Sequence, residues 1–173
     1  MAKKLLLSQI IVTFAENKFG MMKKILLILL AMAALSPAWS QNIALGERAP
    51  EIKIQKWLDG REPAEAPMTY VEFYHSSNRA STSSIERLRK LSEELGDGLR
   101  VVILVREPER KIAQQLAPYL SPHLGVGFDP NGKLFAAYGV SYVPFGVLLG
   151  PRGRALWMGN TLQLTPEIIE KSK

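Results

Sequence analysis

The sequence predicts an α/β domain with a central mixed β-sheet that is flanked by helices and ends in a β-hairpin. Residues 100–105 (RVVILV) are a continuous apolar run, which is typical of a parallel strand buried on both faces. Residues 85–95 carry leucine or isoleucine every three or four positions, as one face of a helix does. Two apolar runs enclose residues 150–153 (GPRG), and this pattern indicates a hairpin.

The first elements expected are two strands. Residues 51–57 alternate loosely between apolar and charged side chains, which indicates a half-buried strand. Asp59-Gly60 and the proline-rich residues 62–67 separate this segment from residues 68–74. That second segment is rich in Tyr, Val and Phe and is predicted as a strand. Residues 75–82 are polar and are expected to form a loop.

The first helix has two possible starts. Residues 83–86 (SSIE) match a capping box, with Ser83 as the N-cap and Glu86 at the third helical position. Asn78 is also a good N-cap, and it would start the helix earlier. Residues 96–98 (GDG) are expected to end the helix.

The remaining elements follow from apolar spacing and from turn residues. They are a helix over about 108–117, a strand over 126–129, a short helix over 133–138, strands over 145–149 and 154–158, and a last helix over 166–173 with Thr165 as its N-cap. A mixed sheet with helices on both faces accommodates this order.

The amino-terminal residues are expected to be a leader. Residues 21–40 combine a short positive start, an apolar run of about eleven residues and a small-residue cleavage signal before Gln41, as a signal peptide does. Residues 1–20 are interpreted as a start-site extension, and residues 41–173 as the folded domain. The apolar run is too short to span a membrane, so we expect no stable membrane anchor after cleavage.

Charge and composition exclude several functions. Removing residues 1–40 lowers the basic count from 22 to 17 and the acidic count from 16 to 15, so the net charge falls from +6 to +2. A nucleic-acid partner is therefore not expected. The chain has no cysteine, so it has neither a disulfide nor a lipid attachment cysteine.

Few residues suggest a cofactor or a metal. His75 and His123 are the only histidines and no acidic cluster accompanies them, so no metal site is predicted. The chain has no G-x-S-x-G elbow for a serine hydrolase. Gly125-x-Gly127 lacks the remainder of a dinucleotide fingerprint. We therefore predict no cofactor.

Four local motifs follow one another along the chain. They are the entry Gly46-Glu47-Arg48-Ala49-Pro50, the strand Val71-Glu72-Phe73-Tyr74, the run Tyr138-Gly139-Val140 followed by Val143-Pro144, and the terminal hairpin around residues 147–153. In this order they resemble the thioredoxin-like superfamily, in particular its exported TlpA-like or redoxin branch. The resemblance covers about residues 45–173. It implies that Pro144 is the cis-proline of this fold. Together with the leader, it also implies that the chain is exported to the periplasm.

The chain departs from the family where the chemistry takes place. The family reads F-W-A-x-W-C-x-x-C-R, whereas residues 73–82 read FYHSSNRAST. Asn78 and Ser81 therefore fall on the two cysteine positions, and Glu72 falls where the family has a buried acid. Thiol–disulfide exchange needs a thiolate, so the family's oxidoreductase activity is not expected here. If Glu72 is buried, its pKa should be raised.

The function predicted first is binding of a protein or an extended peptide by the former active-site face. The residues expected to bind are Asn78, Arg79, Ser81, Tyr142, Val143 and Pro144. In the family, the backbone before the cis-proline pairs with an extended peptide, and this needs no cysteine. Two alternatives remain open: a non-thiol enzyme that uses Ser81 or Tyr74, and a diverged relative with no active site, kept for assembly.

Overall fold

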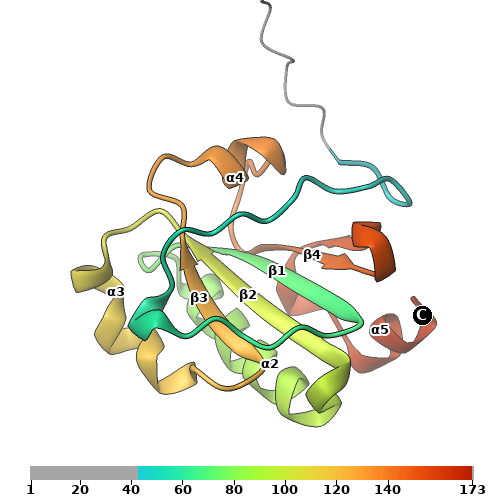
Figure 1. The fold of residues 1–173 in the computed structure, drawn as a ribbon, viewed down its shortest axis with the longest axis horizontal. Helices are drawn as coiled ribbons and strands as arrows, with labels where there is room; N and C mark the ends of the chain where they lie inside the picture. Colours follow the sequence, from blue (N-terminus) through green and yellow to red (C-terminus); the bar gives the residue numbers. More distant parts are fainter. Residues whose placement is uncertain (1–42, 173) are drawn as a thin grey trace, which may run out of the picture. The chain divides into compact units, whose positions relative to one another are not determined.

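The structure is a computed structural model that describes residues 43–172. Its centre is a five-stranded sheet in the order β3-β2-β1-β4-β5 (Figure 1). The strands are β1 (Met68–Tyr74), β2 (Leu99–Val105), β3 (Leu124–Phe128), β4 (Phe145–Leu149) and β5 (Ala155–Gly159). β1, β2 and β3 run parallel, whereas β4 is antiparallel to both β1 and β5. The predicted α/β architecture with a terminal hairpin is confirmed.

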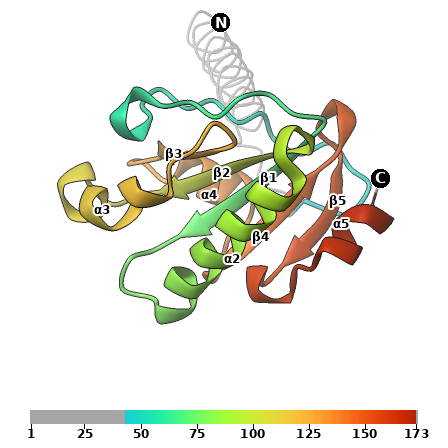
Figure 2. The same ribbon diagram turned by 90° about the horizontal axis from the view of Figure 1, so that it is seen from below.

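Helices cover both faces of this sheet. The helices are α2 (Arg79–Leu95), α3 (Glu109–Leu116), α4 (Lys133–Ala137) and α5 (Pro166–Lys171). Apolar side chains of α2, α3 and α5 share one buried cluster, and those of α4 share the other. Figure 2 shows α2 lying across the sheet on the face opposite the extended amino-terminal segment.

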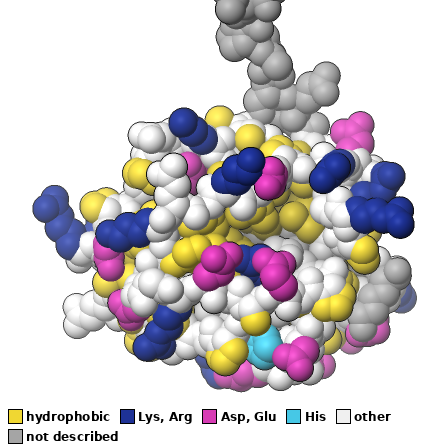
Figure 3. Space-filling view, in the orientation of Figure 1, with side chains coloured by type: hydrophobic (Ala, Val, Ile, Leu, Met, Phe, Trp, Pro, Cys, Tyr) yellow, Lys and Arg dark blue, Asp and Glu magenta, His cyan; other side chains and the backbone are white. Residues whose placement is uncertain are grey.

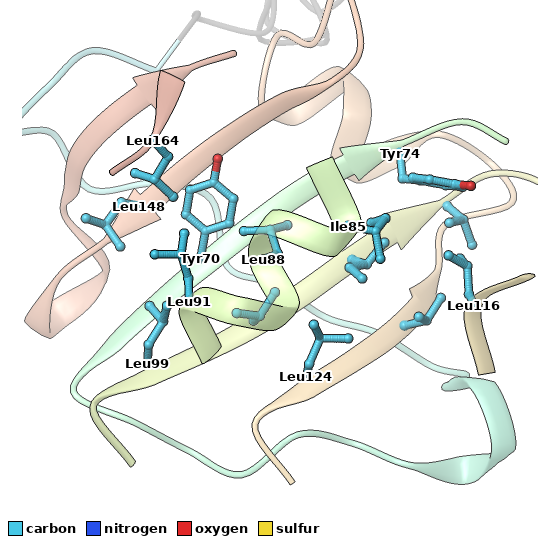
Figure 4. Close-up of a cluster of buried hydrophobic side chains, with 14 of the residues drawn as sticks. Tyr70, Tyr74, Ile85, Leu88, Leu91, Leu99, Leu116, Leu124, Leu148 and Leu164 are labelled. Carbon is cyan, nitrogen blue, oxygen red and sulfur yellow. The ribbon is translucent and has the colours of Figure 1, made fainter. Parts of the chain in front are cut away.

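β1 and β2 alternate their side chains between the two faces of the sheet. The larger of the two buried clusters lies on the α2 face. Tyr70 and Leu99 from the sheet meet Leu88 and Leu91 from α2, all nearly or fully buried (Figure 4). Burial of this kind typically stabilises a fold by about 1.5–3 kcal/mol for each large apolar side chain. Ile85, near the start of α2, and Tyr74, the last residue of β1, belong to the same cluster, so the packing extends to the end of β1.

The strand predicted over residues 51–57 is wrong. The segment makes one isolated bridge, between Trp57 and Gly127, and otherwise lies across the α4 face of the sheet (Figure 1). Its apolar side chains Ile52, Ile54 and Trp57 pack into the second cluster. A Cβ on Gly127 would lie 2.5 Å from Ile54 Cδ1, so the missing side chain permits this close approach.

The first helix begins at the earlier of its two possible starts. Asn78 is the N-cap of α2, and its side chain accepts a hydrogen bond from the Ser81 amide. Ser83 and Glu86 therefore lie inside the helix and form no capping box. The predicted start-site extension, signal peptide and cleavage point fall outside the described residues. Among residues 43–172, no helix has the length and apolar character needed to cross a membrane.

Candidate functional site

The candidate site lies where β1 ends, α2 begins and the chain enters β4. Parallel strands bring their carboxyl ends to the same edge of a sheet, and α/β proteins commonly bind ligands there. Residues 75–78 connect β1 to α2, and residues 141–144 lead into β4. The Val143-Pro144 peptide bond is cis.

Asn78 joins these two segments through both ends of its amide. Its Oδ1 accepts from the Ser81 backbone N–H at 3.1 Å, and its Nδ2 donates to the Val143 carbonyl oxygen at 2.8 Å. One side chain thus caps the helix and holds the loop before Pro144. The predicted site residues Asn78 and Val143 are therefore in direct contact.

Tyr142 gives this loop an exposed aromatic ring. It is 52% exposed, and its ring packs edge-on against Phe145 with the centroids 5.4 Å apart. Phe145 in turn lies 6.2 Å from the Phe73 ring in β1. Tyr138, the other tyrosine near the loop, is buried, and its hydroxyl donates to the Pro50 carbonyl at 2.8 Å.

Arg79 is exposed at the first position of α2. The backbone N–H groups of Arg79 and Ala80 have no acceptor within the part of the chain that the structure describes. Such groups carry the positive end of the helix dipole. This corner of the site therefore attracts negative charge.

Burial changes the roles predicted for three residues. Ser81 has no exposed surface and Pro144 is buried, so neither side chain can contact a partner as the sequence predicts. Ser81 and Pro144 lie beneath the exposed residues of the site and support their positions. Tyr74 is also buried, with 1% of its surface exposed. An enzyme that works through Ser81 or Tyr74 would have no solvent-accessible hydroxyl.

Glu72 lies beneath the site on the α2 side of β1 and has no exposed surface. Ser84 Oγ lies 2.5 Å from Glu72 Oε1, and the Thr161 hydroxyl contacts Oε2. The Tyr70 hydroxyl lies 2.9 Å from Thr161 Oγ1. Burial raises the pKa of Glu72 to about 8, although the hydrogen bonds from Ser84 and Thr161 act to lower it. The carboxyl group is thus mostly protonated at pH 7.

The hydrogen-bond arrangement around Glu72 is consistent with a neutral carboxyl group. Ser84 Oγ is also 2.7 Å from the Ser81 carbonyl oxygen, yet a hydroxyl has one proton to donate. Ser84 Oγ thus has two acceptors, Glu72 Oε1 and the Ser81 carbonyl oxygen, for its single proton. An ionised Glu72 would need that same proton.

The sequence analysis missed a second carboxylate, Glu107. Its side chain is 6% exposed, and it accepts from the Ser76 backbone N–H at 2.7 Å and from Ser76 Oγ at 2.6 Å. Lys111 Nζ is 2.6 Å away. The sequence offered one signal for Glu107, which is a charged residue two positions after the buried parallel strand β2. The carboxyl end of this strand is expected beside that of β1.

Two further observations on the described residues concern metal and ligand binding. Within residues 43–172, no three His, Cys, Asp or Glu side chains gather closely enough to hold a metal ion. A cavity of about 500 Å³ opens at the opposite end of the sheet, between Thr69, Arg100, Leu149 and Arg152. Figure 3 shows the face of the molecule seen in Figure 1, where hydrophobic side chains gather between charged ones. None of the predicted site residues lines this cavity.

Comparison with known proteins identifies the fold. No family model matches the sequence, and no curated protein matches it. Solved structures do match. One is a thioredoxin-like protein in its oxidized form, with 18% identity, a TM-score of 0.62, and coverage of 75% of this chain and 97% of that one.

Two further solved structures agree with this result. One is a putative thiol:disulfide interchange protein DsbE from Chlorobium tepidum, with 19% identity, a TM-score of 0.58, and coverage of 76% of this chain and 96% of that one. The other is an exposed lipoprotein thioredoxin, Etrx1, from Streptococcus pneumoniae, with 19% identity, a TM-score of 0.50, and coverage of 62% and 83%. This chain therefore has a thioredoxin-like fold, and it has no cysteine at any position.

Proposed function

We propose that this protein is an exported, redox-inactive thioredoxin-like domain that binds an extended peptide or protein segment. The binding surface consists of Asn78, Arg79, Tyr142 and Val143. The observation that carries the proposal is the contact between Asn78 and Val143. Asn78, which stands at the first cysteine position, holds the loop before Pro144 in place. The loop is therefore kept in position in a chain that has no thiol to react beside it.

Val143 can still pair with an extended chain. Its backbone N–H has no acceptor within the described residues. Its carbonyl oxygen accepts one bond, from Asn78, and a carbonyl has a second lone pair. Main-chain pairing of this kind supplies affinity in strand-addition complexes, and neighbouring side chains supply specificity.

The chemistry of the neighbouring side chains favours a particular kind of segment. Tyr142 presents a half-exposed ring beside the pairing position, and partly exposed aromatic rings are frequent anchors in interfaces. Arg79 and the free amides of the first turn of α2 add positive charge. An extended segment with an apolar side chain next to an acidic one fits these two features.

Redox inactivity is proposed from composition. A thiolate is the nucleophile of disulfide exchange, and the chain contains no cysteine. Neither the Asn78 amide nor the buried Ser81 hydroxyl replaces it.

Export is proposed from the leader pattern in residues 21–40. The names of two structural neighbours, a DsbE protein and an exposed lipoprotein thioredoxin, are in keeping with a location outside the cytoplasm. We propose the periplasm as the location of the protein.

A peptide selection tests the binding proposal. A display library of unstructured peptides is selected against the purified protein, and the dissociation constants of the enriched peptides are measured for variants. We expect Tyr142→Ala and Arg79→Ala each to weaken binding by about tenfold, which corresponds to about 1.4 kcal/mol. Leu45→Ala and Lys90→Ala are the matched controls, because Leu45 is 62% exposed and Lys90 is exposed on α2.

Crosslinking locates the same surface independently. A photoreactive residue at position 79 should capture the enriched peptides, whereas one at position 90 should not. Equal capture at both positions, or peptides that bind Tyr142→Ala as tightly as the unaltered protein, would place the binding site elsewhere.

A further inference from the structure

Three side chains beyond the ends of β1 and β2 form a line of contacts that peptide binding does not use. Ser77 Oγ lies 2.9 Å from His75 Nδ1, and His75 Nε2 lies 3.9 Å from Glu107 Oε1. His75 and Ser77 belong to the loop after β1, and Glu107 follows the parallel neighbour β2. A hydroxyl, an imidazole and a carboxylate therefore stand in sequence at the carboxyl edge of the sheet.

The contacts assign the proton positions on the His75 ring. The Ser77 backbone N–H also approaches Nδ1, at 3.3 Å, so Nδ1 faces two donors and acts as an acceptor. In a neutral imidazole the proton is then on Nε2, the nitrogen that faces Glu107. A ring in this tautomer has its basic lone pair directed at the Ser77 hydroxyl.

The groups around Glu107 favour the ionised form of its carboxyl group. Burial would raise its pKa, but the bonds from Lys111, from the Ser76 side chain and from the Ser76 backbone, together with the charge of His75, lower the pKa below its ordinary value. These bonds also fix the position of the carboxylate. The charge of Glu107 would stabilise the imidazolium that forms when His75 accepts a proton.

Ser77 is accessible to solvent, and backbone N–H donors lie close to it in the chain. Ser77 is exposed, and 38% of the His75 side chain is exposed. The unpaired N–H groups of Arg79 and Ala80 start α2 two and three positions after Ser77. Backbone donors at a helix start are groups that can stabilise the oxyanion of an acyl-transfer step.

We propose that Ser77 is a nucleophile for acyl transfer from short-chain carboxylic esters, with His75 as its general base and Glu107 as a positioning residue. Ser77 Oγ bonds to the ester carbonyl carbon while its proton passes to His75 Nδ1. The bond to the alcohol oxygen then breaks, and the leaving alcohol takes the proton from His75. Water, deprotonated by His75, releases the acid from Ser77 and returns the serine proton. Ser77 is exposed in this loop, so a small ester can reach its hydroxyl directly.

Acetylation by 4-nitrophenyl acetate tests the proposal on the intact protein. Mass spectrometry of peptides measures acetylation at Ser77 and, in the same molecules, at Ser83, an exposed serine inside α2. We expect Ser77 to acetylate much faster than Ser83. We expect His75→Gln to slow the Ser77 reaction by about 100-fold, the lower end of general-base effects, and Ser83→Ala to leave it unchanged.

The stability of the variants separates a catalytic role for His75 from a structural one. His75→Gln should slow acetylation of Ser77 without changing the midpoint of urea unfolding. Glu107→Gln should also slow this reaction, because an amide carries no charge to stabilise the imidazolium, and Glu107→Asp should restore part of the rate. Equal acetylation of Ser77 and Ser83, or an unaltered rate in His75→Gln, would overturn the proposal.

Discussion

The side-chain amide of Asn78 donates to the carbonyl oxygen of Val143, 65 positions later in the chain, over 2.8 Å. This bond connects the first turn of α2 to the cis-proline loop, and both segments belong to the proposed binding surface. Because Asn78 also caps α2, one residue organises both parts of the surface before any partner arrives. Such preorganisation lowers the entropy lost on binding.

The first prediction separates the two bonds of Asn78. Asn78→Ala removes both and should lower the free energy of unfolding by about 2 kcal/mol, from the lost cap and the lost hydrogen bond. Asn78→Ser keeps a capping oxygen but is too short to reach Val143, so it should lose about half as much. Urea unfolding measures both values. Equal losses in the two variants would mean that the contact with Val143 contributes nothing.

The second prediction concerns Glu72 and pH. Its pKa is about 8 in the folded protein against 4.5 ordinarily, so the folded state holds a proton that the unfolded state releases between these values. The free energy of unfolding should therefore fall as pH rises from 5 to 8, by roughly 3 kcal/mol from this group. The stabilisation is fully present below pH 4.5.

Glu72→Gln is the matched variant, because it keeps the shape of the side chain and cannot ionise. The decline in the free energy of unfolding between pH 5 and pH 8 should be smaller in Glu72→Gln by that same amount. Urea unfolding at the two pH values measures the difference. Parallel declines in both proteins would assign the pH dependence to other groups.

The third prediction rests on the close approach of Tyr70 to Gly146. A Cβ on Gly146 would lie 1.8 Å from the Tyr70 hydroxyl oxygen, and that hydroxyl is held by Thr161. Gly146→Ala should therefore destabilise the fold by about 1–3 kcal/mol through overpacking. Gly98→Ala is the control, because a Cβ there would meet nothing within 4 Å. Thermal unfolding of both variants should show a lower midpoint for Gly146→Ala alone.

Most elements could be predicted because their patterns are local. The continuous apolar run of β2 and the spacing of leucines in α2 identify both elements from neighbouring residues alone. Residues 51–57 were misassigned because loose alternation describes any extended segment with one buried side. Whether such a segment pairs with a strand or crosses a sheet depends on distant residues, here on the close approach that Gly127 permits to Ile54.

The site could be predicted in part. The burial of Ser81 follows once α2 is known to start at Arg79, because Ser81, Ser84 and Leu88 then share the inner face of the helix. The contacts of Glu107 could not be predicted from local sequence. Ser76 and Glu107 are 31 positions apart, and only the parallel pairing of β1 with β2 brings them together.

The last prediction restores the chemistry that the chain lacks. Asn78→Cys combined with Ser81→Cys places two thiols at the first turn of α2, beside the cis-proline loop and above the buried Glu72. The thiol at position 78 would lie at the helix start, where the free N–H groups of Arg79 and Ala80 stabilise a thiolate. We expect the double variant to reduce the disulfides of insulin in the presence of dithiothreitol. The unaltered protein should add nothing to the rate of dithiothreitol alone. Asn78→Cys alone should be slower than the double variant, because its mixed disulfide with insulin has no second protein thiol to resolve it. A double variant that forms its disulfide but remains inactive would show that the face has changed beyond its two cysteine positions.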